Sequence, residues 1–121
     1  MIVAVGIDII ELHRIEKILA SRFKKRFLER TYTAIELEYC LAKKNSLPSL
    51  AARFAAKEAF QKTWFESHGW HDVWVEFEGV KPVLRVAPKL AQVMRQNKWQ
   101  AHLSLSHTLE NAVASVILEV T

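Results

Sequence analysis

The sequence contains a single cysteine, Cys40, in 121 residues. One cysteine cannot form an intramolecular disulfide, so the fold cannot depend on such bonds. No apolar run approaches the length of about 20 residues that a membrane-spanning helix needs, and the segment 1–5 lacks the basic residues that open a signal peptide. No internal repeat or low-complexity tract is present. These absences predict a cytoplasmic protein with no membrane partner.

Length and composition fit one globular domain over residues 1–121. Half of the residues are hydrophobic and a quarter are charged, which is the balance of a soluble folded protein. A chain of this length has room for one modest core. So small a domain has little surplus stability, and association with copies of itself would help. Four tryptophans and six phenylalanines could supply the interface.

The chain is basic, with 17 Lys and Arg against 13 Asp and Glu and a formal net charge of +4. This excess is either an ordinary solvated surface or a surface for an anionic partner, namely nucleic acid, membrane, a phosphorylated ligand or an acidic protein. The positive charge is densest from Arg22 to Phe27. Charge alone does not choose between these partners.

Apolar periodicity predicts the order of the secondary-structure elements. The strands are predicted at 2–10, 73–77, 83–86, 102–106 and 112–120. The helices are predicted from residue 11 onward, over 34–43 after a capping box at Thr33, over 50–64 with Ser49 as its cap, and over 88–96. Residues 45–48 are predicted to form a break. This order indicates an α+β domain with a mainly antiparallel sheet packed with helices.

Asp8 is the first candidate for chemistry, because it interrupts the apolar segment 3–10. A carboxylate at such a position is costly to bury without a partner. Either it accepts backbone hydrogen bonds or pairs with an arginine, or it binds a hard cation, which prefers carboxylate oxygens. Gly6, two positions earlier, would allow a ligand or a neighbouring backbone to come close.

The helix predicted at 50–64 carries two pairs of charged residues four positions apart. Glu58 and Lys62 share one face, and Arg53 and Lys57 share a neighbouring face. The spacing alone favours ordinary ion-pairing positions on the surface. Five alanines favour close packing around the helix instead: Ala51, Ala52, Ala55, Ala56 and Ala59.

The segment 104–108, Ser-Leu-Ser-His-Thr, ends a predicted strand with three hydroxyls and an imidazole. A serine beside a histidine suggests a hydrolase, but no Gly-x-Ser-x-Gly motif accompanies it. Either the segment is a polar strand end, or His107 donates a hydrogen bond to a phosphate. The other histidines lack the spacing of metal ligands and are interpreted as surface or packing residues: His13, His68, His71 and His102.

Three segments together resemble the signatures of the holo-[acyl-carrier-protein] synthases, the bacterial single-domain group of the 4'-phosphopantetheinyl transferase superfamily. They are residues 6–15, 51–62 and 104–108, in family order, with a Lys81-Pro82 turn between the last two. The similarity covers essentially the whole chain. The resemblance implies the 4'-phosphopantetheinyl transferase fold. It also implies the transfer of 4'-phosphopantetheine from coenzyme A to a serine of apo acyl carrier protein, with release of adenosine 3',5'-bisphosphate, in support of fatty acid biosynthesis.

The resemblance implies a catalytic group of Asp8, Glu58 and Lys62. Asp8 and Glu58 match the two acids that hold Mg²⁺, and Lys62 matches the basic residue near the reacting phosphate. Breaking a pyrophosphate linkage concentrates negative charge on phosphate oxygens, so catalysis of this kind depends on positioning and charge stabilisation. Either Glu58 or a metal-bound water takes the proton of the carrier-protein serine.

The resemblance also implies two binding regions. Four residues match positions that bind coenzyme A and its phosphates: Arg53, Lys62, His107 and Thr108. Three residues match the basic first-helix region that receives the acidic acyl carrier protein: Arg14, Arg22 and Arg26. Members of this group form homotrimers with active sites between subunits, which agrees with the small size and aromatic content of the chain.

Two segments depart from the family pattern. A glycine-rich segment often follows the lysine that Lys62 matches, whereas residues 63–70 of this chain contain one glycine. The usual Gly-Lys-Pro turn is here Val80-Lys81-Pro82, with Gly79 one place earlier. The first departure concerns the loop beside the pantetheine arm. Neither departure touches the expected metal ligands.

Two other hypotheses compete with the enzyme. A nucleic-acid-binding module would use the basic segment 22–30, but it leaves Asp8 and Glu58 without a role, and no nucleic-acid motif is present. A non-catalytic trimer of the same fold would not require Asp8, Glu58 and Lys62 together. The sequence therefore predicts an enzyme without a nucleic-acid partner.

Overall fold

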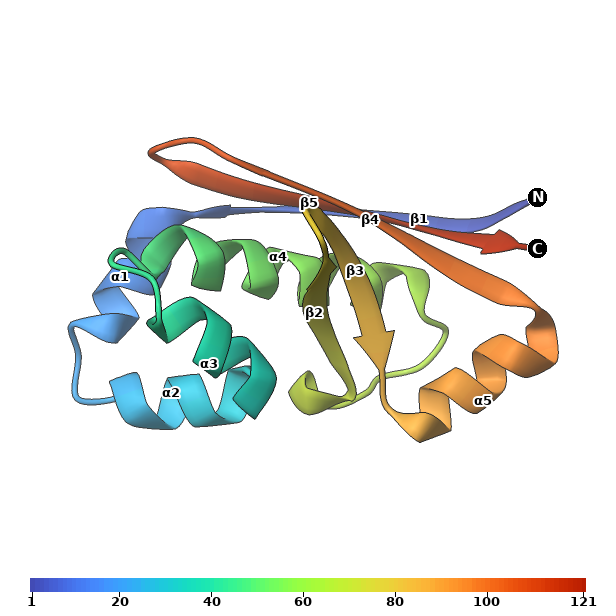
Figure 1. The fold of residues 1–121 in the computed structure, drawn as a ribbon, viewed down its shortest axis with the longest axis horizontal. Coiled ribbons are helices and arrows are strands. Elements are labelled where there is room, and N and C mark those ends of the chain that lie inside the picture. The colour runs from blue at the N-terminus through green and yellow to red at the C-terminus, as the bar shows by residue number, and fades with distance from the viewer.

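The computed structural model describes all 121 residues, Met1–Thr121, as a layer of strands above a layer of helices (Figure 1). The elements are, in order, β1 (Ile2–Glu11), α1 (Leu12–Leu19), α2 (Lys24–Thr31), α3 (Ala34–Leu41), α4 (Leu47–Thr63), the 3-10 helix η1 (Trp70–Asp72), β2 (Val73–Glu78), β3 (Lys81–Val86), α5 (Pro88–Asn97), β4 (Trp99–His107) and β5 (Asn111–Val120). The predicted α+β class is confirmed.

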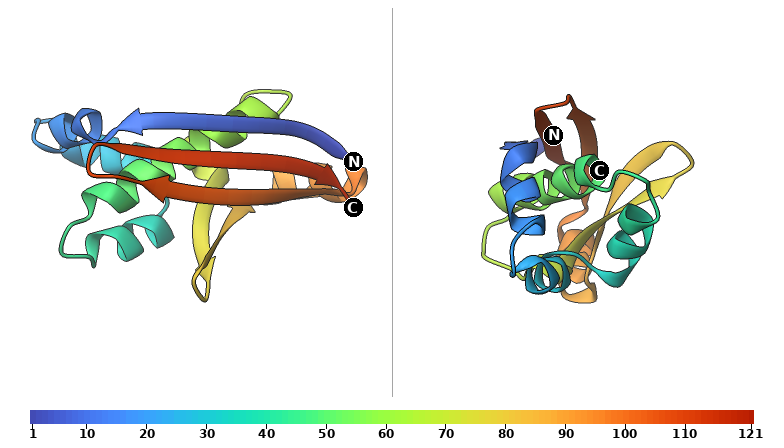
Figure 2. Two further views of the ribbon diagram at one scale, coloured as in Figure 1. Left: turned by 90° about the horizontal axis from the view of Figure 1, so that it is seen from above. Right: turned by 90° about the vertical axis from the view of Figure 1, so that its left-hand side faces the viewer.

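The strands form two separate antiparallel sheets. The larger sheet has the order β1-β5-β4, and the smaller is the β2–β3 hairpin. In the larger sheet Asp8 lies opposite Ala114 of β5, and Ala114 lies opposite Leu105 of β4. The predicted antiparallel arrangement is confirmed, and the hairpin lies to one side of the larger sheet (Figure 2).

Helix α4 lies lengthwise beneath the larger sheet and forms the centre of the core (Figures 1 and 2). Its five predicted packing alanines are all buried. The closest approach is at Gly6, where a Cβ atom would overlap the carbonyl oxygen of Ala59. Short side chains on both elements therefore bring the backbone of β1 against α4, which sets Asp8 beside the helix.

The upper face of the larger sheet is covered by no other element (Figure 2, left). Side chains alternate between the two faces of a strand. In β1 the buried Gly6 and Ile10 face α4, so Val5, Ile7 and Ile9 point outward and are 61%, 60% and 65% exposed. An apolar face of this kind is typical of a protein–protein interface.

The structure corrects the predicted start of α4. The helix begins at Leu47 with Ser46 as its N-cap, not after Ser49. Pro48 lies in the first turn, where its missing N–H would have no helical partner in any case. The predicted break at 45–48 is therefore wrong for its last two residues. Neither α4 nor any other helix has the length and apolar composition needed to cross a lipid bilayer.

The remaining elements agree with the sequence except for two. Neither helix α2 nor η1 is predicted, because most residues of α2 are charged or polar and η1 is a single short turn. The capping box of α3 is confirmed, since Thr33 Oγ1 accepts a hydrogen bond from Glu36 N and the Glu36 carboxylate accepts one from Thr33 N. The predicted strands and α5 are confirmed, with their ends moved by one to three residues.

Candidate active site

Asp8 and Lys62 meet at the edge of the larger sheet. Lys62 Nζ donates a hydrogen bond to the Ile7 carbonyl oxygen at 2.7 Å and lies 3.4 Å from Asp8 Oδ1. The Asp8 side chain is 19% exposed because β1 places it on the face toward α4, whereas that of Lys62 is 53% exposed. A nearby positive charge offsets part of the cost of burying the carboxylate. Two of the three predicted catalytic residues therefore lie together.

Glu58 lies one helical turn before Lys62 on the same face of α4. The surface ion pair that the spacing favours does not form, because Lys62 turns to Asp8. The partly buried Glu58 makes no ion pair or side-chain hydrogen bond with any residue of the chain, and it lines a small cavity beside His68 and Gly69. Its carboxylate is thus available to a ligand on the side of the helix where Asp8 and Lys62 meet.

Arg53 lies on the other side of the same helix. It precedes Lys62 by nine residues, which is about two and a half helical turns and turns the two side chains to opposite faces. Arg53 is 2% exposed, and its guanidinium lies beside two aromatic rings that stack on each other, 4.4 Å from the Tyr39 centroid and 5.6 Å from the Phe77 centroid. Its Nε is buried and has no hydrogen-bond partner. The prediction, from the spacing, that Arg53 lies on the surface is therefore wrong.

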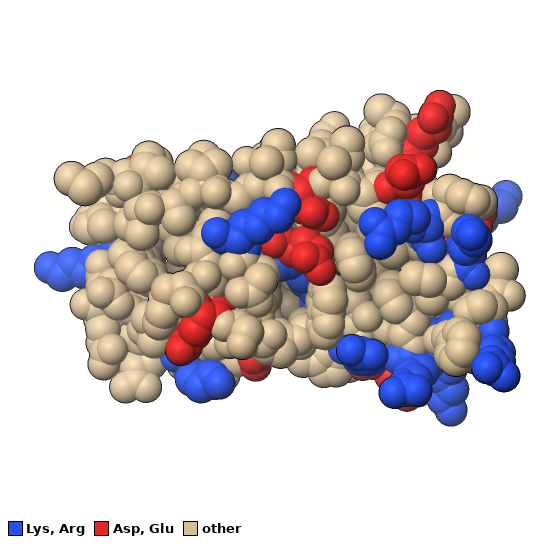
Figure 3. All heavy atoms as spheres, turned by 180° about the vertical axis from the view of Figure 1, so that it is seen from behind, with Lys and Arg blue, Asp and Glu red and all other residues tan.

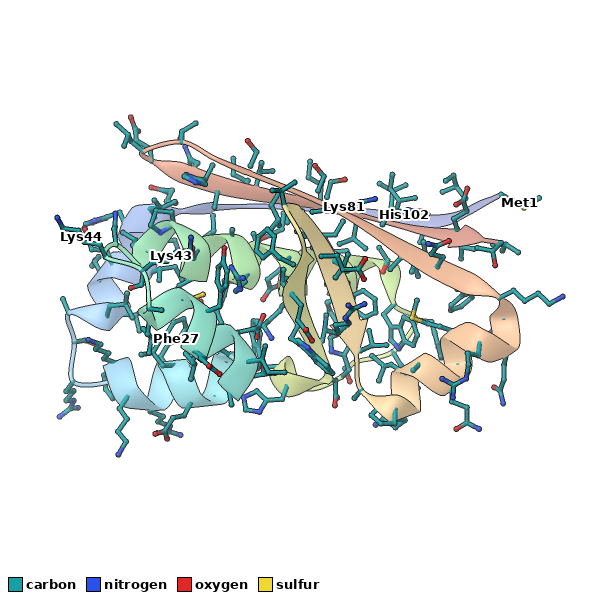
Figure 4. The ribbon with its side chains drawn as sticks, in the orientation of Figure 1. Met1, Phe27, Lys43, Lys44, Lys81 and His102 are labelled. Atoms are coloured by element: carbon teal, nitrogen blue, oxygen red, sulfur yellow. The ribbon has the colours of Figure 1, made fainter.

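Arg53 lines a cavity of about 310 Å³ between α3, the hairpin and β4. His107 lines the same cavity, together with Lys43 and Ser106, so the third signature contributes to its wall. A buried arginine, a histidine and a lysine around one cavity favour an anionic ligand such as a phosphate. The labelled Lys43 lies at the end of α3 in Figure 4.

Thr108 and Lys62 do not line this cavity. Thr108 lies in the turn between β4 and β5, where its Oγ1 accepts hydrogen bonds from the N–H groups of Glu110 and Asn111. Of the four residues expected to bind coenzyme A, the structure therefore brings together Arg53 and His107. Lys62 lies on the opposite side of α4, and the Thr108 hydroxyl stabilises a turn.

The sequence analysis missed a buried ion pair between Lys57 and Glu36. Lys57 Nζ lies 2.7 Å from Glu36 Oε1 and also donates to the carbonyl oxygens of Trp70 and Val73, at 2.8 Å and 2.5 Å. Glu36 Oε2 accepts from Val75 N at 3.0 Å. The two side chains are 2% and 0% exposed, so the surface position that spacing favours for Lys57 is wrong. The only sequence signal was the place of Glu36 in the capping box.

Burial around this pair shifts three pKa values. Desolvation lowers the pKa of Lys57 from its ordinary 10.5, although the adjacent Glu36 carboxylate opposes the shift. Desolvation raises the pKa of the Cys40 thiol from 9.0 to about 11, and it raises that of Tyr32 well above 10.0. The Tyr32 hydroxyl donates to the Leu50 carbonyl oxygen at 2.8 Å. This region therefore keeps its thiol and phenol neutral.

The segment that replaces the family's glycine-rich stretch is packed by aromatic rings. Trp64 is buried and stacks on Phe60, with ring centroids 5.2 Å apart. Trp64 and Phe65 both contact Trp99, edge to face, at 5.8 Å and 6.3 Å. Aromatic contacts of this kind stabilise a conformation that a glycine-rich loop would not fix. The loop after α4 is thus anchored to the start of β4.

Basic residues surround an apolar cavity near α1 and α2. Arg14, Arg22 and Arg26 are exposed, and Lys and Arg side chains gather at the lower right of Figure 3, the end of the molecule where α1 and α2 lie. Arg26 also lines a cavity of about 470 Å³. Arg30 and a group of apolar side chains line the same cavity: Ile18, Phe23, Phe27, Phe54 and Trp70. This surface combines positive charge with an apolar recess.

The expected metal ligands supply two carboxylates. No three side chains of His, Cys, Asp or Glu come together to hold a metal ion by themselves. Two carboxylates suit Mg²⁺, which keeps most of its positions for water and substrate phosphates. The Lys62 ammonium on Asp8 Oδ1 and the Ile7 carbonyl oxygen indicates that this oxygen-rich corner accommodates a cation. The donor set around Asp8 and Glu58 therefore fits the ion.

Comparison with known proteins agrees with the resemblance in the sequence. Residues 4–117 match the model of the 4'-phosphopantetheinyl transferase superfamily. A holo-[acyl-carrier-protein] synthase from Thermus thermophilus is 51% identical over 119 residues, which cover 98% of this chain and 94% of the relative. One from Deinococcus radiodurans is 50% identical over 127 residues, with the same coverage of both chains.

A solved structure shares the fold. It is a holo-(acyl-carrier-protein) synthase from Bacillus anthracis in complex with CoA (3',5'-ADP). It has a TM-score of 0.82 and 37% identity to this chain, and the match covers 100% of this chain and 99% of the other. The sequence and the fold therefore agree, and the chain belongs to the 4'-phosphopantetheinyl transferase superfamily and, within it, to the holo-[acyl-carrier-protein] synthases.

Proposed function

We propose that this protein transfers 4'-phosphopantetheine from coenzyme A to a serine of apo acyl carrier protein, releasing adenosine 3',5'-bisphosphate, in support of cytoplasmic fatty acid biosynthesis. The observation that carries the proposal is the side of α4 facing β1, where Asp8 meets Lys62 and Glu58 has no partner. Membership of the holo-[acyl-carrier-protein] synthases supports the same reaction.

The chemistry requires positive charge at the pyrophosphate of coenzyme A. Asp8 and Glu58 would hold Mg²⁺, which when bound supplies that charge to the phosphate oxygens. Lys62 adds an ammonium one helical turn from Glu58. Because it is 53% exposed, it has the freedom to turn from Asp8 toward the phosphoryl group that is transferred.

The serine of the carrier protein must lose its proton as it attacks the phosphate. Glu58 makes no ion pair or side-chain hydrogen bond, so its carboxylate is free either to accept that proton or to bind the metal while a bound water accepts it. The reacting centre would thus lie on the β1 side of α4.

The nucleotide end of coenzyme A would bind in the cavity of Arg53 and His107. The unpartnered Arg53 Nε offers a donor to a phosphate oxygen, and the guanidinium lies against the stacked rings of Tyr39 and Phe77. This cavity lies on the opposite side of α4 from Lys62. One substrate that touches both sets of residues must therefore lie between two copies of the chain.

We accordingly propose a homotrimer with its sites between subunits. The uncovered face of the larger sheet supports this assembly, because Val5, Ile7 and Ile9 expose an apolar surface that association would bury. Sedimentation velocity of the wild type and of Ile7→Lys tests the proposal. We expect a trimer for the wild type and a monomer for the variant, with activity lost in parallel. A monomeric, active wild type would overturn it.

The carrier protein would dock on α1, α2 and the turn between them, which carry Arg14, Arg26 and Arg22 respectively. Complementary charge accelerates the encounter with an acidic protein, and the adjacent apolar cavity offers a site for one of its apolar side chains. Arg26→Glu should raise the KM for the carrier protein while leaving the KM for coenzyme A unchanged. Arg95→Glu, at the far end of the molecule in α5, is the matched control. Equal effects in both variants would contradict this docking surface.

The reaction itself is tested by mass spectrometry of apo acyl carrier protein after incubation with this protein, coenzyme A and Mg²⁺. We expect a mass gain of one phosphopantetheine on a serine, which EDTA abolishes. Glu58→Gln should lose on the order of 10²-fold or more in rate while remaining folded by circular dichroism. No gain across several apo carriers with a folded wild type would favour the non-catalytic hypothesis.

A further inference from the structure

We propose that Lys62 acts as an internal counter-ion that occupies the Asp8 carboxylate in the free protein and competes there with the divalent cation. The inference rests on the proposed function, because it concerns the same metal site. It adds a regulatory property to that site: the cation binds weakly until an anionic substrate draws the lysine away. The argument depends on three features of the Asp8 region.

The first feature is the setting of Asp8. Its carboxylate interrupts the apolar run of β1 from Ile2 to Ile10, and 81% of its side chain is hidden on the face toward α4. A carboxylate in such a setting requires a positive partner or hydrogen-bond donors. Lys62 is the only basic residue that forms an ion pair with it. The free protein therefore uses Lys62 to neutralise Asp8.

The second feature is the overlap between the ammonium and a bound cation. Lys62 Nζ lies against Asp8 Oδ1 and the Ile7 carbonyl oxygen, so a metal ion on Asp8 would approach the same oxygen atoms. An ammonium and a divalent cation repel each other strongly at such short range. The two cations therefore exclude each other from Asp8, and the metal must displace the lysine.

The third feature is the freedom of Lys62 to leave. Its side chain is 53% exposed, and the distance of 3.4 Å to Asp8 Oδ1 is long for a charge-assisted hydrogen bond. A phosphate would be a stronger partner for the ammonium than this carboxylate at 3.4 Å. Binding of coenzyme A would thus release Asp8 for the metal. By reciprocity the metal would strengthen binding of coenzyme A by the same factor.

Titration with Mn²⁺ alone, followed by the electron paramagnetic resonance signal of the free ion, tests the competition. We compare the wild type with Lys62→Met, and use Lys89→Met as the control, because Lys89 is an exposed lysine of α5 that forms no ion pair. Lys62→Met should bind Mn²⁺ at least about fivefold more tightly than the wild type. Lys89→Met, with the same loss of charge, should bind like the wild type.

The outcomes separate this inference from the proposed function. Equal or weaker Mn²⁺ binding by Lys62→Met, with binding abolished in Asp8→Asn, would overturn the competition and leave the metal site in place. The absence of Mn²⁺ binding in every variant, with transfer activity that survives EDTA, would overturn the metal site as well. Circular dichroism of each variant establishes that the protein compared is folded.

Discussion

Helix α4 carries two lysine–carboxylate pairs in opposite environments. Lys57 and Glu36 are 2% and 0% exposed and lie 2.7 Å apart. Lys62 and Asp8 are 53% and 19% exposed and lie 3.4 Å apart. The two lysines are five positions apart in one helix, so the same local structure presents one ammonium to the core and the other to solvent.

The difference shows that one helix can carry one lysine that stabilises the fold and another that is available for the reaction. The Lys57 ammonium has an acceptor for each of its three protons, because the carbonyl oxygens of Trp70 and Val73 complete the contact with Glu36. Because all of its hydrogen bonds are made, this buried ammonium stays in place, and its contacts join α3, α4 and β2. The Lys62 ammonium is less completely bound and can exchange partners, as phosphoryl transfer requires.

Breaking the buried pair should have the largest effect on stability. Lys57→Met leaves the Glu36 carboxylate buried without its counter-charge, which costs about 3–5 kcal/mol of unfolding free energy. Urea denaturation measures it. The double variant Glu36→Gln/Lys57→Met removes both charges and should recover part of the loss. A loss below about 1 kcal/mol in the single variant would mean that the pair does not hold the elements together.

Alkaline pH should have the second largest effect on the free energy of unfolding, because ionisable groups are buried near the Lys57–Glu36 pair. The folded-state pKa of Cys40, about 11, lies above its ordinary value of 9.0, so folding favours the neutral thiol. The stabilisation is present below pH 9 and is lost as the pH rises through about 11, amounting to roughly 2–3 kcal/mol. Tyr32 shifts in the same direction, whereas the lowered pKa of Lys57 opposes it.

Comparison with Cys40→Ala isolates the thiol from the other two groups. Denaturation of both proteins at several values between pH 8 and about pH 11 gives the difference in slope. The variant should lose less stability over this range than the wild type, whatever its stability at pH 8. Parallel curves would show that the thiol does not contribute to the pH dependence.

Removing the capping hydroxyl of Thr33 should lower the free energy of unfolding by a smaller amount. Thr33→Ala deletes the Oγ1 that accepts from Glu36 N and leaves the Lys57–Glu36 pair intact. We expect a loss of about 1 kcal/mol in thermal or urea unfolding. Thr33→Ser keeps the hydroxyl and is the control. A loss as large as that of Lys57→Met would show that the cap and the ion pair act as one unit.

Breaking the exposed pair should have the smallest effect on stability. Lys62→Met removes a half-exposed charge at 3.4 Å, and such pairs contribute less than about 1 kcal/mol. Transfer activity should fall steeply in the same variant, because the ammonium is needed at the phosphate. A small loss of stability with a large loss of activity would distinguish Lys62 from Lys57, whose removal should mainly lower stability. A loss of stability comparable to that of Lys57→Met would remove the distinction between the two pairs.

Local sequence patterns predicted most elements of the fold. The apolar runs of β1 and β5, the capping box at Thr33 and the alanines of α4 depend on neighbours within a few residues, so they are visible in the sequence. The predicted start of α4 lies three residues too late, because Pro48 is typical of a break but also fits the first turn of a helix. In helix α2 only Phe27 and Leu28 are apolar, and the helix depends on their packing against the rest of the molecule.

Three local signatures, which include Asp8, Glu58 and Lys62, are enough to identify the family. The partner of each charged side chain of α4, in contrast, depends on the tertiary structure. Lys57 pairs with a carboxylate from α3 and with carbonyl oxygens beside β2, while Lys62 reaches back to β1. Spacing along a helix gives the direction of a side chain, but what lies there is set by elements distant in the sequence. The cost of burying a charge then determines which contacts the folded chain must supply.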